Sequence, residues 1–238
     1  MRGEPLLPPI PRSPRPWDLL PVLLGNLVPL AGALVLGWPL GMVLVAYWLE
    51  TVVVGAFALL RILFAGGPPP NPSFPLRVAL AGFFTVHFGL FVFVHGIFVT
   101  LLAAGETGGS WRLGSLPLNG PLNGPVAVAS DLALVLGGLV VANGIAFVRE
   151  YVLGTGRGAA TAQHEMARPY GRILVQHFVI LAGGFLAIGA GGGAWVLVPA
   201  MLVKLVLEAL GAMRPPVFRL AGGTALRRPA GEQGPGAT

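Results

Sequence analysis

Residues 83–99 read FFTVHFGLFVFVHGIFV, which is apolar enough, with its flanks, to cross a bilayer as one helix. Two histidines, His87 and His95, interrupt this run of aromatic and aliphatic residues. An ionisable side chain near the centre of a bilayer costs about 2.5–3.5 kcal/mol on insertion scales, so it usually faces the interior of a bundle and has a partner there. The stretch therefore predicts a membrane helix that carries two polar side chains.

The composition of the whole chain agrees with this interpretation. Of its 238 residues, 55% are hydrophobic and only 10% are charged, and the mean hydropathy is +0.79, whereas about 25% of the residues in soluble domains are charged. The absence of cysteine excludes disulfides, thiolate metal sites and cysteine nucleophiles. These values predict a multi-pass protein of the cell membrane, with the lipid bilayer as its principal partner.

Six apolar stretches of about 20 residues are bounded by charges, prolines or glycines. They predict an all-α membrane protein with six transmembrane helices in a bundle. Three regions follow: a Pro/Arg-rich cytoplasmic N-terminus (1–17), a six-helix transmembrane domain (18–213) and a disordered cytoplasmic tail (214–238). The first two helices are separated only by Gly37, Trp38 and Pro39, which predicts a tight hairpin. The expected spans are 19–37, 40–64, 78–103, 126–148, 173–189 and 194–212.

The distribution of basic residues predicts the orientation. With six spans, thirteen of the fifteen basic residues fall on the side of the two termini, and Arg112 alone lies in the loops of the other side. Cytoplasmic loops carry the excess of Lys and Arg, so both termini should be cytoplasmic. The net charge of +6 is explained by these flanking arginines, and no nucleic-acid partner is expected.

Further ionisable residues lie within the other spans. Glu50 falls near the middle of the second span, while Lys204, the only lysine, and Glu208 lie four residues apart on one face of the sixth. Counting 1.5 Å per residue from the middle of each span places His87 and His177 at the same depth. A histidine can also serve as an interhelical hydrogen-bonding group, and the Lys204–Glu208 pair can be structural. Glu50 needs a proton or a cationic partner.

The order of several motifs resembles a family of uncharacterised six-helix bacterial and archaeal membrane proteins, classed as a domain of unknown function. The matching stretches are YWLETVVVGAF (47–57), residues 83–99, RPYGRILVQHFVILAGGF (168–185) and Lys204 to Glu208. The resemblance implies a shared polar set but brings no known activity. Asn143 stands where the family usually has a histidine. The implied cluster comprises Glu50, His87, His95, Asn143, Tyr170, Arg172, His177, Lys204 and Glu208.

Three kinds of function remain open at this point, and whether the chain is an enzyme is one of the open questions. The first is proton- or ion-coupled transport, with Glu50 as the titrating carboxylate and Lys204–Glu208 as a switching pair. The second is a membrane enzyme in which His87, His177 and Glu50 hold a transition metal or haem, because imidazole and carboxylate suit such ions. The third is a scaffold role in a homo-oligomer or a larger membrane complex.

Overall fold

A computed structural model of the chain describes residues 16–106, 125–190 and 194–213. Regular structure within these ranges is entirely helical, which confirms the all-α class. The predicted tail and almost all of the predicted N-terminal region lie outside the described residues. The elements are α1 (Pro16–Leu34), α2 (Leu40–Phe64), α3 (Phe74–Glu106), α4 (Pro125–Ala146), the π-helical η1 (Phe147–Val152), α5 (Gly156–Ala159), α6 (Ala162–Gly189), the 3-10 turn η2 (Ala194–Leu197) and α7 (Val198–Met213).

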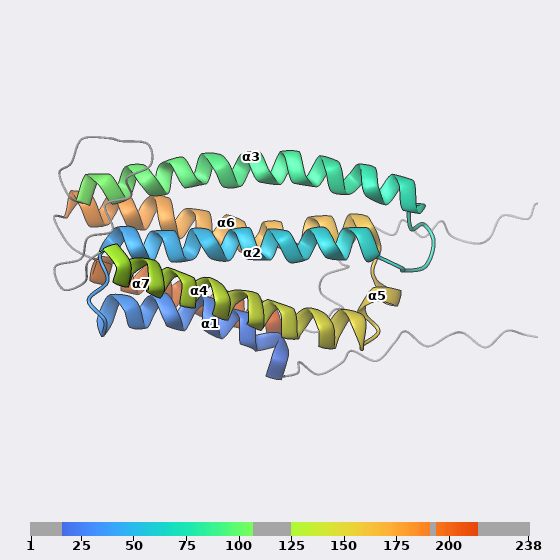
Figure 1. Ribbon diagram of the computed structural model, residues 1–238, viewed down its shortest axis with the longest axis horizontal. Coiled ribbons are helices and arrows are strands. Elements are labelled where there is room, and N and C mark those ends of the chain that lie inside the picture. The colour runs from blue at the N-terminus through green and yellow to red at the C-terminus, as the bar shows by residue number, and fades with distance from the viewer. Residues whose placement is uncertain (1–15, 107–124, 191–193, 214–238) are drawn as a thin grey trace, which may run out of the picture.

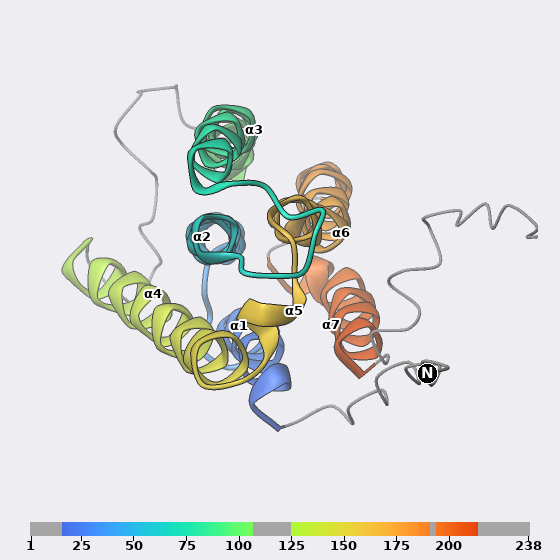
Figure 2. The same cartoon turned by 90° about the vertical axis from the view of Figure 1, so that its right-hand side faces the viewer.

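Consecutive long helices run in alternate directions along the bundle (Figure 1). Seen along its axis, α2 occupies the centre and packs against α1, α3, α4 and α6, while α7 packs against α1 and α6 (Figure 2). The first two turns of α2 are deeply buried, and the apolar residues from Leu40 to Tyr47 are at most 5% exposed. Residues on α2 are therefore the natural meeting point for groups from the surrounding helices.

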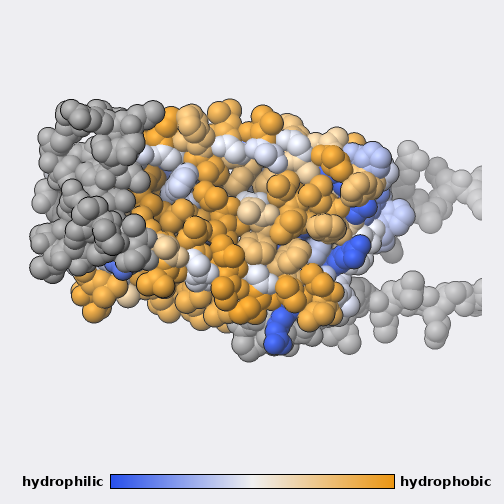
Figure 3. Space-filling view, viewed as in Figure 1, coloured by the Kyte–Doolittle hydropathy of each residue, from blue (hydrophilic) through white to orange (hydrophobic). Residues whose placement is uncertain are grey.

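The outer surface of the bundle is apolar. Helix α3 buries Phe84 and Phe88 but presents Phe83, Val86 and Phe93 outward. Apolar side chains cover the middle of the face seen in Figure 3, and hydrophilic ones gather mainly at the end where α2 meets α3. Five helices are long and apolar enough to cross a membrane, and the apolar part of α1, Leu19–Leu34, is shorter. These features support a multi-pass membrane protein, while the sixth span and the position of the termini stay predictions.

The turn between α1 and α2 is as tight as the sequence predicts. Gly37 has a φ of +65°, a conformation that glycine adopts without steric cost. The next residue, Trp38, donates a backbone hydrogen bond to Gly32 O at 2.9 Å. Its indole ring lies against Gly32, where a Cβ atom would be 2.2 Å from Trp38 Cε3. The missing side chain at Gly32 thus lets the ring fold back onto α1.

The helix that contains the predicted fifth span is longer than that span. Helix α6 begins at Ala162, whereas the span was predicted to begin at residue 173, and Pro169 lies inside the helix. A proline usually favours a helix boundary because it removes one backbone donor and clashes with the preceding turn, but here the helix continues through it. The consequence is that Arg172 lies almost three turns inside a helix and not at its end.

Candidate functional site

Five polar side chains from four helices meet inside the bundle, and we call them the central cluster. Hydrogen bonds and ion pairs link every member of this set to at least two others. The members are Asn26 from α1, Glu50 from α2, Arg172 from α6, and Lys204 and Glu208 from α7.

Lys204 lies at the centre of this cluster and is completely buried. Its ammonium group donates to Asn26 Oδ1 at 2.9 Å and to Glu50 Oε2 at 3.0 Å. The same nitrogen is 3.0 Å from Glu208 Oε1, one helical turn further along α7. It also lies 4.9 Å from the centre of the Tyr47 ring, a cation–π distance. The ammonium group therefore donates two hydrogen bonds and has a third oxygen at ion-pair distance.

Arg172 is the second cation of the cluster and contacts both carboxylates. Its Nη2 atom pairs with Glu50 Oε1, its Nε atom is 3.3 Å from Glu208 Oε1, and Nη2 also lies 3.5 Å from Pro21 O. Each carboxylate thus contacts both cations, and the two acids and two bases balance in formal charge. The Arg172 side chain is 20% exposed, against 1% for Glu50 and 5% for Glu208. Arg172 is consequently the most exposed member of the set.

Helix α1 approaches the cluster closely because of one glycine. A Cβ atom at Gly25 would lie 1.9 Å from Glu50 Oε1, so the missing side chain makes room for the carboxylate. The next residue, Asn26, donates from Nδ2 to Glu208 Oε2 at 2.8 Å and to Val22 O at 2.8 Å. A bulkier residue at position 25 would separate Asn26 from the charged groups.

A second layer of polar contacts joins α6 to α2 beside the cluster. Gln176 is buried, and its Nε2 atom donates to the Tyr47 carbonyl and to Thr51 Oγ1, the latter at 2.8 Å. The Thr51 hydroxyl lies 3.3 Å from the same Tyr47 carbonyl. The Tyr47 hydroxyl is buried without a hydrogen-bond partner among the described residues. The region between α2 and α6 is thus polar for more than one helical turn.

The histidines are grouped differently from the prediction. The rings of His95 and His177 are in contact, with centroids 4.5 Å apart, and the Phe91 ring lies 5.0 Å from that of His177. His87 instead stacks on Phe83 and lies 6.1 Å from the ring of Tyr170. The depth estimate that paired His87 with His177 was wrong, because the early start of α6 moves its midpoint and brings His177 level with His95.

The remaining predicted site residues lie outside the cluster. His87 is exposed on the outer surface of α3. Asn143 bonds within its own helix, from Nδ2 to Leu139 O at 2.9 Å. No three His, Cys, Asp or Glu side chains in the described ranges are placed to hold a metal ion. The predicted set of His87, His177 and Glu50 is therefore not assembled in this structure.

A second group of charges lies where α2, η1 and α6 meet at one end of the bundle, and we call it the end cluster. It consists of Arg61, Glu150, Glu165 and Arg168. Glu150 pairs with Arg61 at 3.1 Å and with Arg168 at 3.2 Å, and Arg168 is 3.6 Å from Glu165. The π-helical turn η1 brings in Tyr151 as well, whose hydroxyl donates to Arg61 O at 2.6 Å.

Sequence reasoning thus identified four of the five members of the central cluster. It missed Asn26 as a site residue, and it also missed Gln176 in the adjacent layer. Both are amides inside apolar segments, and such residues make interhelical hydrogen bonds in membrane bundles. That signal is present at both positions, although an amide can also bond within its own helix, as Asn143 does.

Comparison with known protein families gives a match over most of the chain. The model of a family of unknown function (DUF6498) matches residues 9–225 of the chain. No curated protein and no solved structure matches. Because the family model covers most of the sequence, including all five members of the central cluster, the chain belongs to this family of unknown function, DUF6498.

Proposed function

We propose that this chain is a multi-pass protein of the cell membrane that couples transport to the movement of protons or other ions, with the central cluster as its coupling site. The observation that carries the proposal is the buried, charge-balanced set of two carboxylates and two cations that joins α1, α2, α6 and α7. Intramembrane ionisable groups of this kind typically mark ion or substrate pathways.

The proposed orientation has six spans, α1 included, with both termini in the cytoplasm. The connections from α2 to α3 and from η1 to α6 lie at the same end of the bundle as the start of α1 and the end of α7 (Figure 1). Five arginines lie in or next to those two connections, which supports a cytoplasmic location under the positive-inside rule. They are Arg61, Arg77, Arg149, Arg157 and Arg168.

The geometry suggests how a proton could act as the switch. Glu50 is the only member of the central cluster on α2. A proton on Glu50 would remove the ion pairs that connect α2 to Lys204 and Arg172 and leave one uncompensated positive charge. Glu208 would still pair with both cations, so α6 and α7 would stay connected. Because an unbalanced buried charge is strongly unfavourable, protonation would favour a conformation in which α2 moves relative to α7 or the cluster takes up water.

A flux assay tests the proposal directly. The full chain is reconstituted into liposomes that contain a pH-sensitive dye, and a sodium or potassium gradient is imposed. We expect a pH change in the lumen that Glu50→Gln abolishes and Glu150→Gln preserves. The second variant makes the same chemical change in the end cluster and serves as the matched control. Equal flux in protein-free liposomes and in the wild type, or unchanged flux in Glu50→Gln, would contradict ion coupling by this site.

Hydrogen exchange tests the switch independently of the transported species. In liposomes of the wild type, amides of α2 near Glu50 should lose protection as the pH falls, after correction for the intrinsic pH dependence of amide exchange, because protonated Glu50 no longer pairs with Lys204 and Arg172. In Glu50→Gln the same amides should have low protection at every pH. Protection that is independent of pH in the wild type and unaffected by Glu50→Gln would exclude the switch.

One observation favours a second function, a scaffold role. Every charge in the central cluster is already paired, as in a purely structural network. A scaffold predicts that Glu50→Gln lowers thermal stability while neither flux nor the pH dependence of hydrogen exchange changes. Cross-linking in native membranes would then identify a second copy or another subunit.

A further inference from the structure

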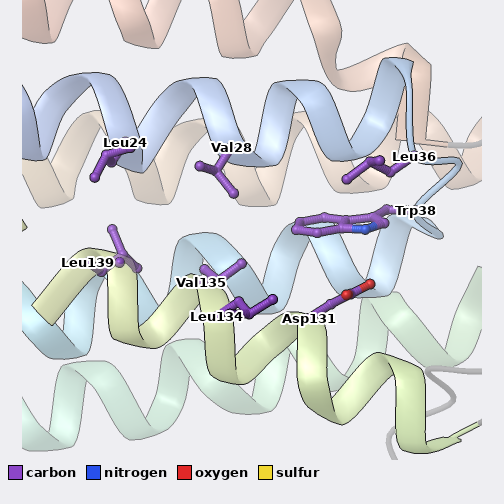
Figure 4. Close-up of a pocket in the computed structure, with 9 residues that line it drawn as sticks. Leu24, Val28, Leu36, Trp38, Asp131, Leu134, Val135 and Leu139 are labelled. Atoms are coloured by element: carbon purple, nitrogen blue, oxygen red, sulfur yellow. The ribbon is translucent and has the colours of Figure 1, made fainter. Parts of the chain in front are cut away.

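A pocket of about 260 Å³ lies between α1, the turn before α2, and α4 (Figure 4). Its walls are apolar side chains from α1 and α4, including Leu24, Val28 and Leu139. Leu36 and Leu134 also line it and are 55% and 75% exposed, so the pocket opens at the surface of the bundle. Its volume is just below the range of about 300–1,000 Å³ for sites that enclose a whole drug-sized ligand. A pocket of this size and opening suits one part of a longer amphipathic molecule.

The pocket has two polar groups, and both lie at the end nearest the turn between α1 and α2 (Figure 4). Trp38 is only 6% exposed, and its indole nitrogen has no hydrogen-bond partner among the described residues. The Asp131 carboxylate has no ion-pair partner in the described part of the chain. A buried donor without an acceptor costs about 1–3 kcal/mol, so a ligand that supplies an acceptor is favoured there.

These two groups define the chemistry of the occupant. A carboxylate attracts a cation that carries N–H donors. An indole N–H group requires an acceptor, such as a phosphate oxygen. The rest of the pocket offers only apolar surface, which suits an acyl chain. A zwitterionic lipid with a primary ammonium group satisfies all three requirements at once.

We propose that this pocket binds a membrane lipid of the phosphatidylethanolamine type, with its ammonium group on Asp131, its phosphate near the indole N–H of Trp38 and part of an acyl chain along α1 and α4. The site is separate from the central cluster, since Leu24 and Val28 line the pocket while Gly25 and Asn26 contact Glu50 and Glu208. The proposal is therefore independent of ion coupling.

Two pairs of comparisons test the site. Gly138 lines the pocket, and a Cβ atom there meets nothing within 4 Å, so Gly138→Leu should fill the pocket without a clash in the backbone. Gly137 also has open space but does not line the pocket, so Gly137→Leu is the matched control. Asp131→Asn removes the charge and keeps the size of the side chain.

The purified full chain is incubated with equal amounts of phosphatidylethanolamine and phosphatidylcholine, and native mass spectrometry counts the lipids that remain bound. Both lipids are zwitterionic, but only the first has N–H donors. We expect the wild type and Gly137→Leu to retain phosphatidylethanolamine about threefold to fivefold better, as for one partly exposed charged contact. Asp131→Asn and Gly138→Leu should each abolish this preference. Equal retention by the wild type, or a preference that persists in Gly138→Leu, would overturn the proposal.

Discussion

The central cluster and the end cluster contain the same kinds of residue in different surroundings. In the central cluster the side chains of Glu50 and Lys204 are 1% and 0% exposed. In the end cluster the side chains of Glu150 and Arg168 are 35% and 31% exposed, whereas those of Arg61 and Glu165 are 10% and 3% exposed. Both groups link α2 to α6, but only the central one also reaches α1 and α7. Ion pairs of glutamate with a basic residue are thus used once in the interior and once at a partly exposed end of the same bundle.

The difference lies in what happens when one partner is lost. A rim charge that loses its partner is solvated by water, so a single exposed pair contributes about 0–1 kcal/mol. An interior charge has no such alternative, and breaking a buried pair costs about 3–5 kcal/mol. The central cluster is consequently sensitive to a change of one charge, which is the property that a coupling site requires. The end cluster has the properties of an ordinary structural contact.

The largest expected effect is that of Lys204→Met. This variant leaves Glu50 and Glu208 with Arg172 as their only cation, so one buried negative charge is uncompensated. We expect the free energy of unfolding to fall by about 3–5 kcal/mol. The measurement is reversible unfolding by SDS in mixed micelles, followed by circular dichroism.

The double variant Lys204→Met/Glu50→Gln sharpens the same comparison. It restores charge balance, since Glu208 and Arg172 remain as a pair. Its loss of stability should be smaller than the sum of the two single losses by about 1–3 kcal/mol, as found for residues that share a network. Strict additivity would show that charge balance does not govern the central cluster.

The sequence predicts much of this site because charged residues inside apolar helices need partners. Glu50, Lys204 and Glu208 were identified on that ground alone. The sequence does not predict which helices rotate toward one another, and so the contact of His95 with His177 was not foreseen. Arg172 entered only through the family resemblance, because the predicted fifth span begins just after it. The structure continues α6 through Pro169.

An intermediate effect is expected for Gly25→Ala. The added methyl group would meet the Glu50 carboxylate, so α1 must shift and the bonds of Asn26 must lengthen. Overpacking of this kind costs about 1–3 kcal/mol. Gly89→Ala on α3 is the control, because a Cβ atom there meets nothing within 4 Å. Equal unfolding free energies for the two variants would mean that α1 does not approach Glu50 this closely.

The smallest effect is expected for Glu150→Gln. The amide keeps an oxygen acceptor for Arg61 and Arg168, and Arg168 still has Glu165 at 3.6 Å. Position 150 and Arg168 are accessible to solvent, and the new amide still accepts from Arg61, so the free energy of unfolding should fall by less than about 1 kcal/mol, and added salt should reduce the difference further. Unfolding by SDS measures the loss of unfolding free energy. Repeating it in about 0.5 M NaCl, where screening is strong, measures how far salt reduces that loss. A loss as large as that of Lys204→Met would mean that the end cluster is also shielded from water, and the contrast in exposure between the two clusters would then not determine their energetics.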